Sequence, residues 1–109
     1  MATIKWTDRA KALRKELYLS GAMNFGSITA LKMARRIESL ADALSLFPGM
    51  GFREPLLEER DPTYRACLVN KRFKMIYWYD AANNMVVIED IWDTRRAPQN
   101  LIKRIKTYI

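Results

Sequence analysis

The chain has 109 residues, enough for one compact domain and too few for two, so we expect a single domain over residues 1–109. It contains one cysteine and no histidine, which excludes an internal disulfide, a Ser–His–Asp triad and the usual zinc sites. The formal net charge is +7, and residues 64–109 hold nine basic against four acidic groups. Such a positive field favours phosphate backbones or acidic partners.

The N-terminal residues predict a protein that is neither exported nor inserted in a membrane. Residues 1–7 lack the apolar core of a signal peptide. No stretch approaches the roughly 18 consecutive apolar residues of a transmembrane helix. We therefore expect a cytoplasmic chain with no membrane contact, no metal and no small-molecule cofactor.

The first half of the chain predicts a short strand followed by two helices. Residues 3–7 alternate and are rich in β-formers, as in a strand. Helices are expected over 8–23 and from Ser27 to the break at Pro48, because apolar residues recur at spacings of three and four. Two consecutive helices with a short join form an antiparallel hairpin. The apolar stripe of the second helix is Ile28, Leu31, Ala34, Ile37, Ala41 and Leu44.

The second half predicts a loop, three strands and a last helix. Residues 47–63 contain three of the four prolines and two of the four glycines, which indicates a loop. Its charged side chains are expected in solvent: Glu54, Glu58, Glu59, Arg60 and Asp61. The period then changes to two, which predicts strands over 64–69, 73–80 and 85–92, and Pro98 begins a helix over about 98–107.

This order of elements predicts a small α+β fold. It consists of an N-terminal strand, an antiparallel helical hairpin, a three-stranded antiparallel meander and a short C-terminal helix. Asn83-Asn84 is a good two-residue hairpin turn because asparagine tolerates positive φ, and Asn70-Lys71 or its neighbours form the earlier turn.

The two turns predict which side chains share a face of the sheet. They place Lys74 opposite both Cys67 and Asp93. The face expected to pack on the helices is nearly all apolar: Tyr64, Ala66, Leu68, Phe73, Met75, Tyr77, Tyr79, Ile88 and Trp92. The other face is mixed: Arg65, Cys67, Lys74, Ile76, Trp78, Val87, Glu89, Ile91 and Asp93. The mixed face either binds a partner or is covered in part by the last helix through Leu101, Ile102 and Ile105.

The ordered series of motifs resembles the RelE/ParE toxin superfamily, also known as plasmid-stabilisation proteins. The segments YRACLVNKRFKMIYWY and MVVIEDIWDTRRAP follow a strand, a helical hairpin and a Pro-Gly loop. They match the family's Tyr-Arg at Tyr64-Arg65, its aromatic run at Met75 to Tyr79, and its arginine after the last strand at Arg95 or Arg96. The resemblance covers nearly the whole chain. It implies the toxin of a type II toxin–antitoxin system, neutralised by a cognate antitoxin protein.

The resemblance implies two activities and leaves a third role open. RelE-like members are metal-independent endoribonucleases (mRNA interferases) that cleave mRNA on the ribosome, whereas ParE-like members poison DNA gyrase. A degenerate module kept only for antitoxin binding is the third alternative. Ribosome-dependent mRNA cleavage is our first hypothesis, and the site residues that it implies are Lys74, Arg95, Arg96 and Arg65.

The match to a ribonuclease site is incomplete. Ala66 and Leu68 stand where RelE-like members have a basic pair, and Tyr108 is a candidate for their C-terminal catalytic tyrosine. Cleavage at a ribose needs a general base and acid besides cations, and no residue stands out as the base. Lys74 has a structural alternative, a cross-strand ion pair with Asp93.

Overall fold

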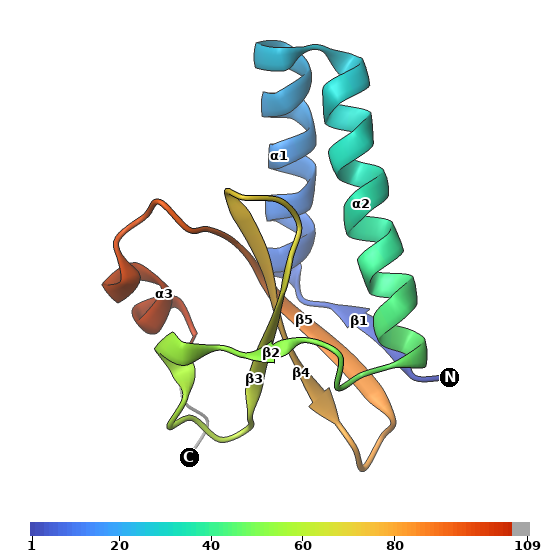
Figure 1. Cartoon of the computed structure of the whole chain (residues 1–109), viewed down its shortest axis with the longest axis vertical. Coiled ribbons are helices and arrows are strands. Elements are labelled where there is room, and N and C mark those ends of the chain that lie inside the picture. Colours follow the sequence, from blue (N-terminus) through green and yellow to red (C-terminus); the bar gives the residue numbers. More distant parts are fainter. Residues whose placement is uncertain (106–109) are drawn as a thin grey trace.

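The computed structural model describes residues 1–105, and it has the predicted α+β fold (Figure 1). The order of elements is β1 (Thr3–Trp6), α1 (Asp8–Phe25), α2 (Ser27–Leu46), β2 (Phe52–Arg53), the 3₁₀ helix η1 (Pro55–Leu57), β3 (Tyr64–Leu68), β4 (Phe73–Asp80), β5 (Met85–Asp93) and α3 (Pro98–Arg104). The predicted helices and strands are all present, with ends that shift by a few residues.

One mixed sheet of five strands forms the centre of the fold, in the order β1-β5-β4-β3-β2. β1 runs parallel to β5, and the other neighbours are antiparallel. β2 and η1 lie where the sequence predicted only a loop, because two residues of strand are too short to give an alternating pattern. Their effect is to hold the loop against β3, with Phe52 opposite Ala66.

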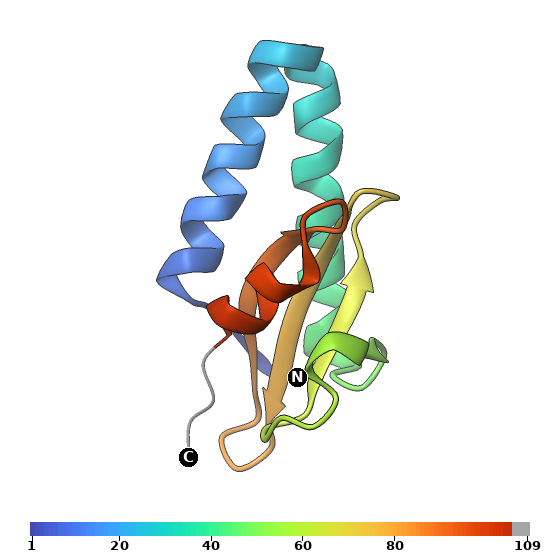
Figure 2. The ribbon, with the colours of Figure 1, turned by 90° about the vertical axis from the view of Figure 1, so that its left-hand side faces the viewer.

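The helical hairpin is longer than the sheet it covers, and its closed end extends beyond the strands (Figures 1 and 2). Its turn is the single residue Gly26, at a φ of 89°, which glycine adopts at little cost. Near the sheet, Ile37 and Leu44 are buried; toward the closed end, Ile28 is 74% exposed and Leu31 is also exposed. The predicted apolar stripe of α2 is therefore buried only in its second half.

The predicted strand registers were wrong. In the β3–β4 pair Leu68 lies opposite Lys74, one residue away from the predicted pairing. The β4–β5 turn spans four residues, although Asn84 has the positive φ that asparagine tolerates. Farther along, Tyr77 pairs with Ile88 but Ile76 pairs with Asp90, which leaves Glu89 as the extra residue of a β-bulge.

These registers divide the buried side chains into two clusters, one on each face of the sheet. The cluster under the hairpin contains Ile37, Leu40, Leu44, Cys67, Phe73, Met75, Tyr77, Val86, Ile88 and Ile91. The cluster under α3 contains Leu57, Tyr64, Ala66, Ile76, Trp92, Leu101 and Ile105, and Figure 2 shows α3 lying across the strands.

Several predicted faces must therefore be corrected. Tyr64, Ala66 and Trp92 lie on the α3 face rather than the hairpin face, and Cys67 and Ile91 lie on the hairpin face, because of the slip and the bulge. Leu68 and Tyr79, which were expected in the core, are exposed. The expected cover by the last helix is confirmed for Leu101 and Ile105, but Ile102 is exposed.

Candidate functional site

Lys74 forms an ion pair with Glu54 on the α3 face of the sheet. Its Nζ is 2.7 Å from Oε2 of Glu54, whose side chain has no exposed surface. The other carboxylate oxygen of Glu54 accepts a hydrogen bond from the Leu56 backbone N–H, which caps η1. The predicted pair between Lys74 and Asp93 was wrong, and so was the expectation that Glu54 is solvated. The positive charge of Lys74 is thus neutralised by the buried carboxylate of Glu54.

Asp90 forms a second buried network on the same face. Its Oδ1 lies 2.7 Å from the Arg104 guanidinium on α3, and its Oδ2 lies 3.9 Å from Arg9 on α1. Burial raises the pKa of Asp90, and the two arginines reduce that rise. The guanidinium of Arg104 also lies 5.2 Å from the ring centre of Trp92. Asp90 therefore links α1, β5 and α3.

The raised pKa of Asp90 predicts a specific pH dependence of stability. The folded chain holds this proton more tightly than the unfolded chain, whose carboxyl titrates near 3.8. The stability from Asp90 is thus fully present below that pH and is lost as pH rises through the folded pKa. In urea unfolding between about pH 3 and 7, the free energy of unfolding of the wild type should fall relative to that of Asp90→Asn. Asp42→Asn, an exposed control, should show no such trend; a difference that grows with pH would contradict the prediction.

Arg65 lies on the opposite face of the sheet from Lys74, contrary to the predicted grouping. It pairs across the strands with Tyr77 and donates a hydrogen bond to the Gly51 carbonyl at 2.9 Å. The Tyr77 hydroxyl accepts from the Gly51 N–H and donates to the Pro48 carbonyl. A side chain at Gly51 would meet this hydroxyl at 2.7 Å. Arg65 therefore fixes the loop between α2 and β2.

Arg95 and Arg96 lie in the segment after β5. Arg95 is paired with Asp93 at 3.6 Å, and Arg72 from the β3–β4 turn binds the same carboxylate at 3.1 Å. Slight burial alone would raise the pKa of Asp93, but hydrogen bonds from the Arg95 N–H and Arg72, with the charges of both arginines, hold it below its ordinary value. The Arg96 guanidinium lies 5.9 Å from the centre of the Trp92 ring.

The four predicted site residues thus belong to three separate networks. Arg95 and Arg96 share one segment of chain, Lys74 pairs with Glu54, and Arg65 bonds to the opposite side of the sheet. Two other side chains that could in principle act as a general base also have partners: Glu89 accepts from the Trp78 indole, and the Tyr79 hydroxyl donates to Asn84. Tyr108 lies outside the described residues.

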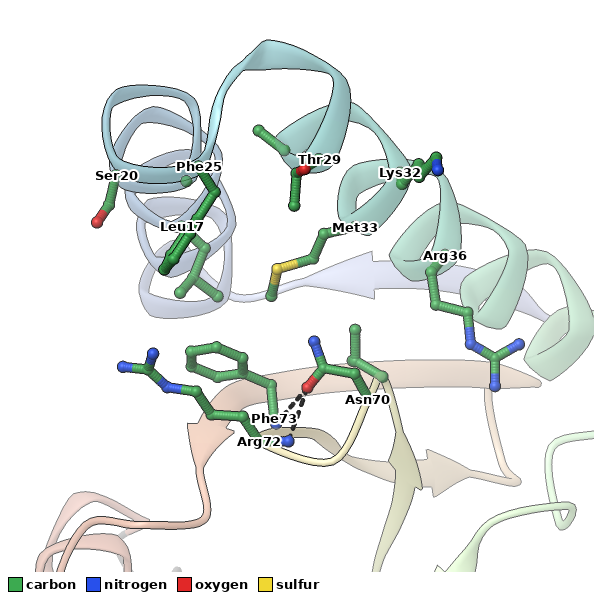
Figure 3. A pocket seen from close by; sticks show the side chains of 13 residues that line it. Leu17, Ser20, Phe25, Thr29, Lys32, Met33, Arg36, Asn70, Arg72 and Phe73 are labelled. Carbon is green, nitrogen blue, oxygen red and sulfur yellow. Dashed lines mark hydrogen bonds between the residues drawn. The ribbon is translucent and has the colours of Figure 1, made fainter.

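An apolar groove of about 530 Å³ lies between the closed end of the hairpin and the β3–β4 turn (Figure 3). Leu17 and Phe25 come from α1, Met33 from α2, and Phe73 from the first position of β4. Three cations also line it: Lys32, Arg36 and Arg72. None of the described residues that line the groove is a carboxylate. Phe25 is 66% exposed, so the groove offers apolar surface bordered by positive charge.

The amino-acid sequence did not predict this groove. The first helix was expected to end at residue 23, whereas α1 continues to Phe25, so the Phe25 side chain is still held by the helix. The available signal was the presence of Met23, Phe25 and Ile28 around a predicted turn, where polar residues are usual. Glu54 was missed in a similar way, since an acidic residue directly before proline is typical of a helix N-cap.

A helical hairpin on one face of a small sheet, a short helix on the other face and an apolar groove with a cationic border define a small α+β fold. The family model described as the ParE toxin of the type II toxin-antitoxin system parDE matches residues 4–98. The chain therefore belongs to this family of toxins, and the RelE/ParE resemblance is confirmed.

Solved structures of related toxins have the same fold. The chromosomal ParDE system of P. aeruginosa matches with a TM-score of 0.67 at 21% identity, over 85% of this chain and 96% of that chain. A YoeB/ParE toxin from Agrobacterium tumefaciens gives 0.58 at 15% identity, over 84% and 96%. The YoeB dimer from Staphylococcus aureus gives 0.51 at 19% identity, over 80% and 90%. No curated protein matches the sequence significantly. Within residues 1–105, no helix is long and apolar enough to span a bilayer.

Proposed function

We propose that this toxin acts as ParE-like members do, by poisoning DNA gyrase in the cytoplasm without cleaving RNA. The observation that supports this proposal is the 2.7 Å ion pair between Lys74 and the buried Glu54. A ribonuclease needs cations free to stabilise the charge at the scissile phosphate. A lysine already neutralised by a buried carboxylate is poorly suited to that task.

Ribosome-dependent mRNA cleavage is the second candidate. It is favoured by Arg95, whose side chain is 65% exposed and faces only one carboxylate among its described contacts. An exposed arginine at the end of the sheet can contact a phosphate. In this mechanism Arg95 and Arg96 would supply cations, and the base would have to come from outside the networks described above.

Controlled expression in a bacterial host separates these activities. Gyrase poisoning predicts an SOS response and gyrase-dependent DNA breaks, with no new in-frame mRNA 5′ ends. Purified toxin should likewise inhibit supercoiling by purified gyrase. New mRNA ends that require the ribosome would overturn the proposal in favour of the ribonuclease. Normal growth without either effect would overturn it in favour of a module that only binds the antitoxin.

The proposal includes a cognate antitoxin that occupies the apolar groove. An amphipathic segment can place its apolar side chains between Leu17, Phe25 and Met33, in the manner of helix-in-groove recognition. The cations at the border, Lys32, Arg36 and Arg72, favour a segment with acidic flanks. The positive potential of these cations also speeds the association of the toxin with an acidic antitoxin.

Substitution of one exposed groove residue tests this interface. Phe25→Glu should weaken binding to the small protein encoded next to the toxin by about 30-fold or more, which equals the roughly 2 kcal/mol of an interface hot spot. Leu19→Glu is the matched control, since Leu19 is 51% exposed on α1 and does not line the groove. Isothermal titration calorimetry measures both affinities. Equal losses in the two variants would place the antitoxin elsewhere.

A further inference from the structure

Four cations from two distant segments meet at one corner of the sheet. Lys71 and Arg72 lie in the β3–β4 turn, and Arg95 and Arg96 follow β5. Thr94 joins the two segments, because its backbone N–H donates to the Arg72 carbonyl at 2.7 Å and its hydroxyl donates to the same oxygen at 2.9 Å. We call these four cations the basic corner.

The basic corner keeps a large excess of positive charge. In the described ion pairs of the basic corner, the carboxylate is that of Asp93, which binds both Arg72 and Arg95. Four cations and one carboxylate leave a net charge of +3. Lys71, Arg72, Arg95 and Arg96 are all exposed. The partner that this corner attracts must therefore carry several negative charges.

The three arginines of the basic corner also make contacts within the fold. The Asn70 side-chain oxygen accepts hydrogen bonds from the backbone N–H groups of Arg72 and Phe73, both at 2.8 Å (Figure 3). Asp93 fixes the guanidinium of Arg72, and the Arg96 guanidinium lies over the Trp92 ring. Such preorganisation lowers the entropy lost when a ligand binds. A regularly charged polymer suits this arrangement better than a single small anion.

We propose that the basic corner binds the phosphate backbone of double-stranded DNA. Guanidinium groups match phosphate oxygens with paired hydrogen bonds, and backbone contacts need no particular base sequence. The choice of DNA rests on the proposed function, because gyrase presents duplex DNA next to any toxin bound to it. The corner holds the toxin against that DNA without taking part in a cleavage step.

Fluorescence anisotropy of a short labelled DNA duplex of mixed sequence, titrated with the toxin alone at several salt concentrations, tests the proposal. Each phosphate contact contributes about 0.9 to the slope of log K against log salt. Arg95→Ala/Arg96→Ala should lower that slope by about 2 and weaken binding at least about tenfold at moderate salt. Lys11→Ala/Lys15→Ala removes two exposed cations of α1 instead and should leave the slope near that of the wild type.

The outcomes are distinct from those of the gyrase assay, because gyrase is absent from the titration. Equal slopes for the two double variants, or no binding of duplex DNA at low salt, would overturn the basic corner as a DNA site. Tighter binding of single-stranded RNA of the same length than of duplex DNA would overturn it as well, and would assign the corner to RNA. A normal DNA titration combined with inactive toxin in the gyrase assay would refute the proposed target and leave the site standing.

Discussion

Lys74→Ala is expected to lower the free energy of unfolding by about 3–5 kcal/mol, because it leaves the Glu54 carboxylate buried without its cation. A similar truncation at an exposed ion pair would cost less than about 1 kcal/mol. Urea unfolding measures the difference. A loss below about 1 kcal/mol would contradict a buried ion pair and would mean that Lys74 is free to contact a phosphate.

The double variant Lys74→Met/Glu54→Gln is the informative companion. It removes both charges and keeps the Glu54 side-chain oxygen that accepts from the Leu56 N–H. Buried ion pairs replaced by uncharged groups of similar size often regain stability. We expect this variant to recover most of the loss and to stay toxic. A folded double variant without toxicity would make Lys74 a functional residue, as the sequence resemblance implied.

Trp92→Ala is expected to cost about 3–5 kcal/mol, since it empties the largest side chain from the cluster under α3. Trp92 packs with Leu101 and Ile105, and Arg104 lies over its ring. The loss should therefore detach α3, so backbone amides of residues 98–105 should exchange with solvent faster than those of β4. Hydrogen exchange and thermal unfolding measure the two effects.

Phe25→Ala provides the control for this experiment. Phe25 is aromatic too, but it is mostly exposed at the closed end of the hairpin. Its removal should change stability by less than about 0.5 kcal/mol. Similar losses for Trp92→Ala and Phe25→Ala would mean that α3 does not depend on the tryptophan ring.

Periodicity predicted the elements well and their pairing poorly. The strand over 73–80 has the predicted bounds, because Phe73, Met75, Tyr77 and Tyr79 recur at every second position and mark one face along the strand. Register depends instead on turn length and on bulges, which alternation does not encode. The turn of four residues at 81–84 moved the register by two residues, and the extra residue Glu89 was enough to move Trp92 to the other face.

The candidate site was less predictable than the fold. Arg95 and Arg96 lie at the end of the sheet, as expected for residues that directly follow the last strand. The surroundings of Lys74 could not be predicted, because Glu54 approaches it from a loop that has no period. The groove exists because the closed end of the hairpin lies above the β3–β4 turn (Figure 1). Its position depends on the lengths of both helices and on their packing against the sheet, which the periodic pattern does not give. The roles of Lys74, Arg65, Arg95 and Arg96 in toxicity stay predictions.

The bulge at Glu89 determines which side chains at the end of β5 face the hairpin and which face α3. If β5 lacked the bulge and Glu89 paired with Ile76, the two sides would be exchanged for every residue from Asp90 to the end of the strand. Asp90 and Trp92 would then point at the hairpin, and Ile91 would point at α3. A gain or loss of a residue in the turn at 81–84 carries no such inversion. Length variation among relatives should therefore accumulate in that turn, and a relative that lacks one residue between Val86 and Asp93 should also lack the bulge, which keeps the two faces as they are.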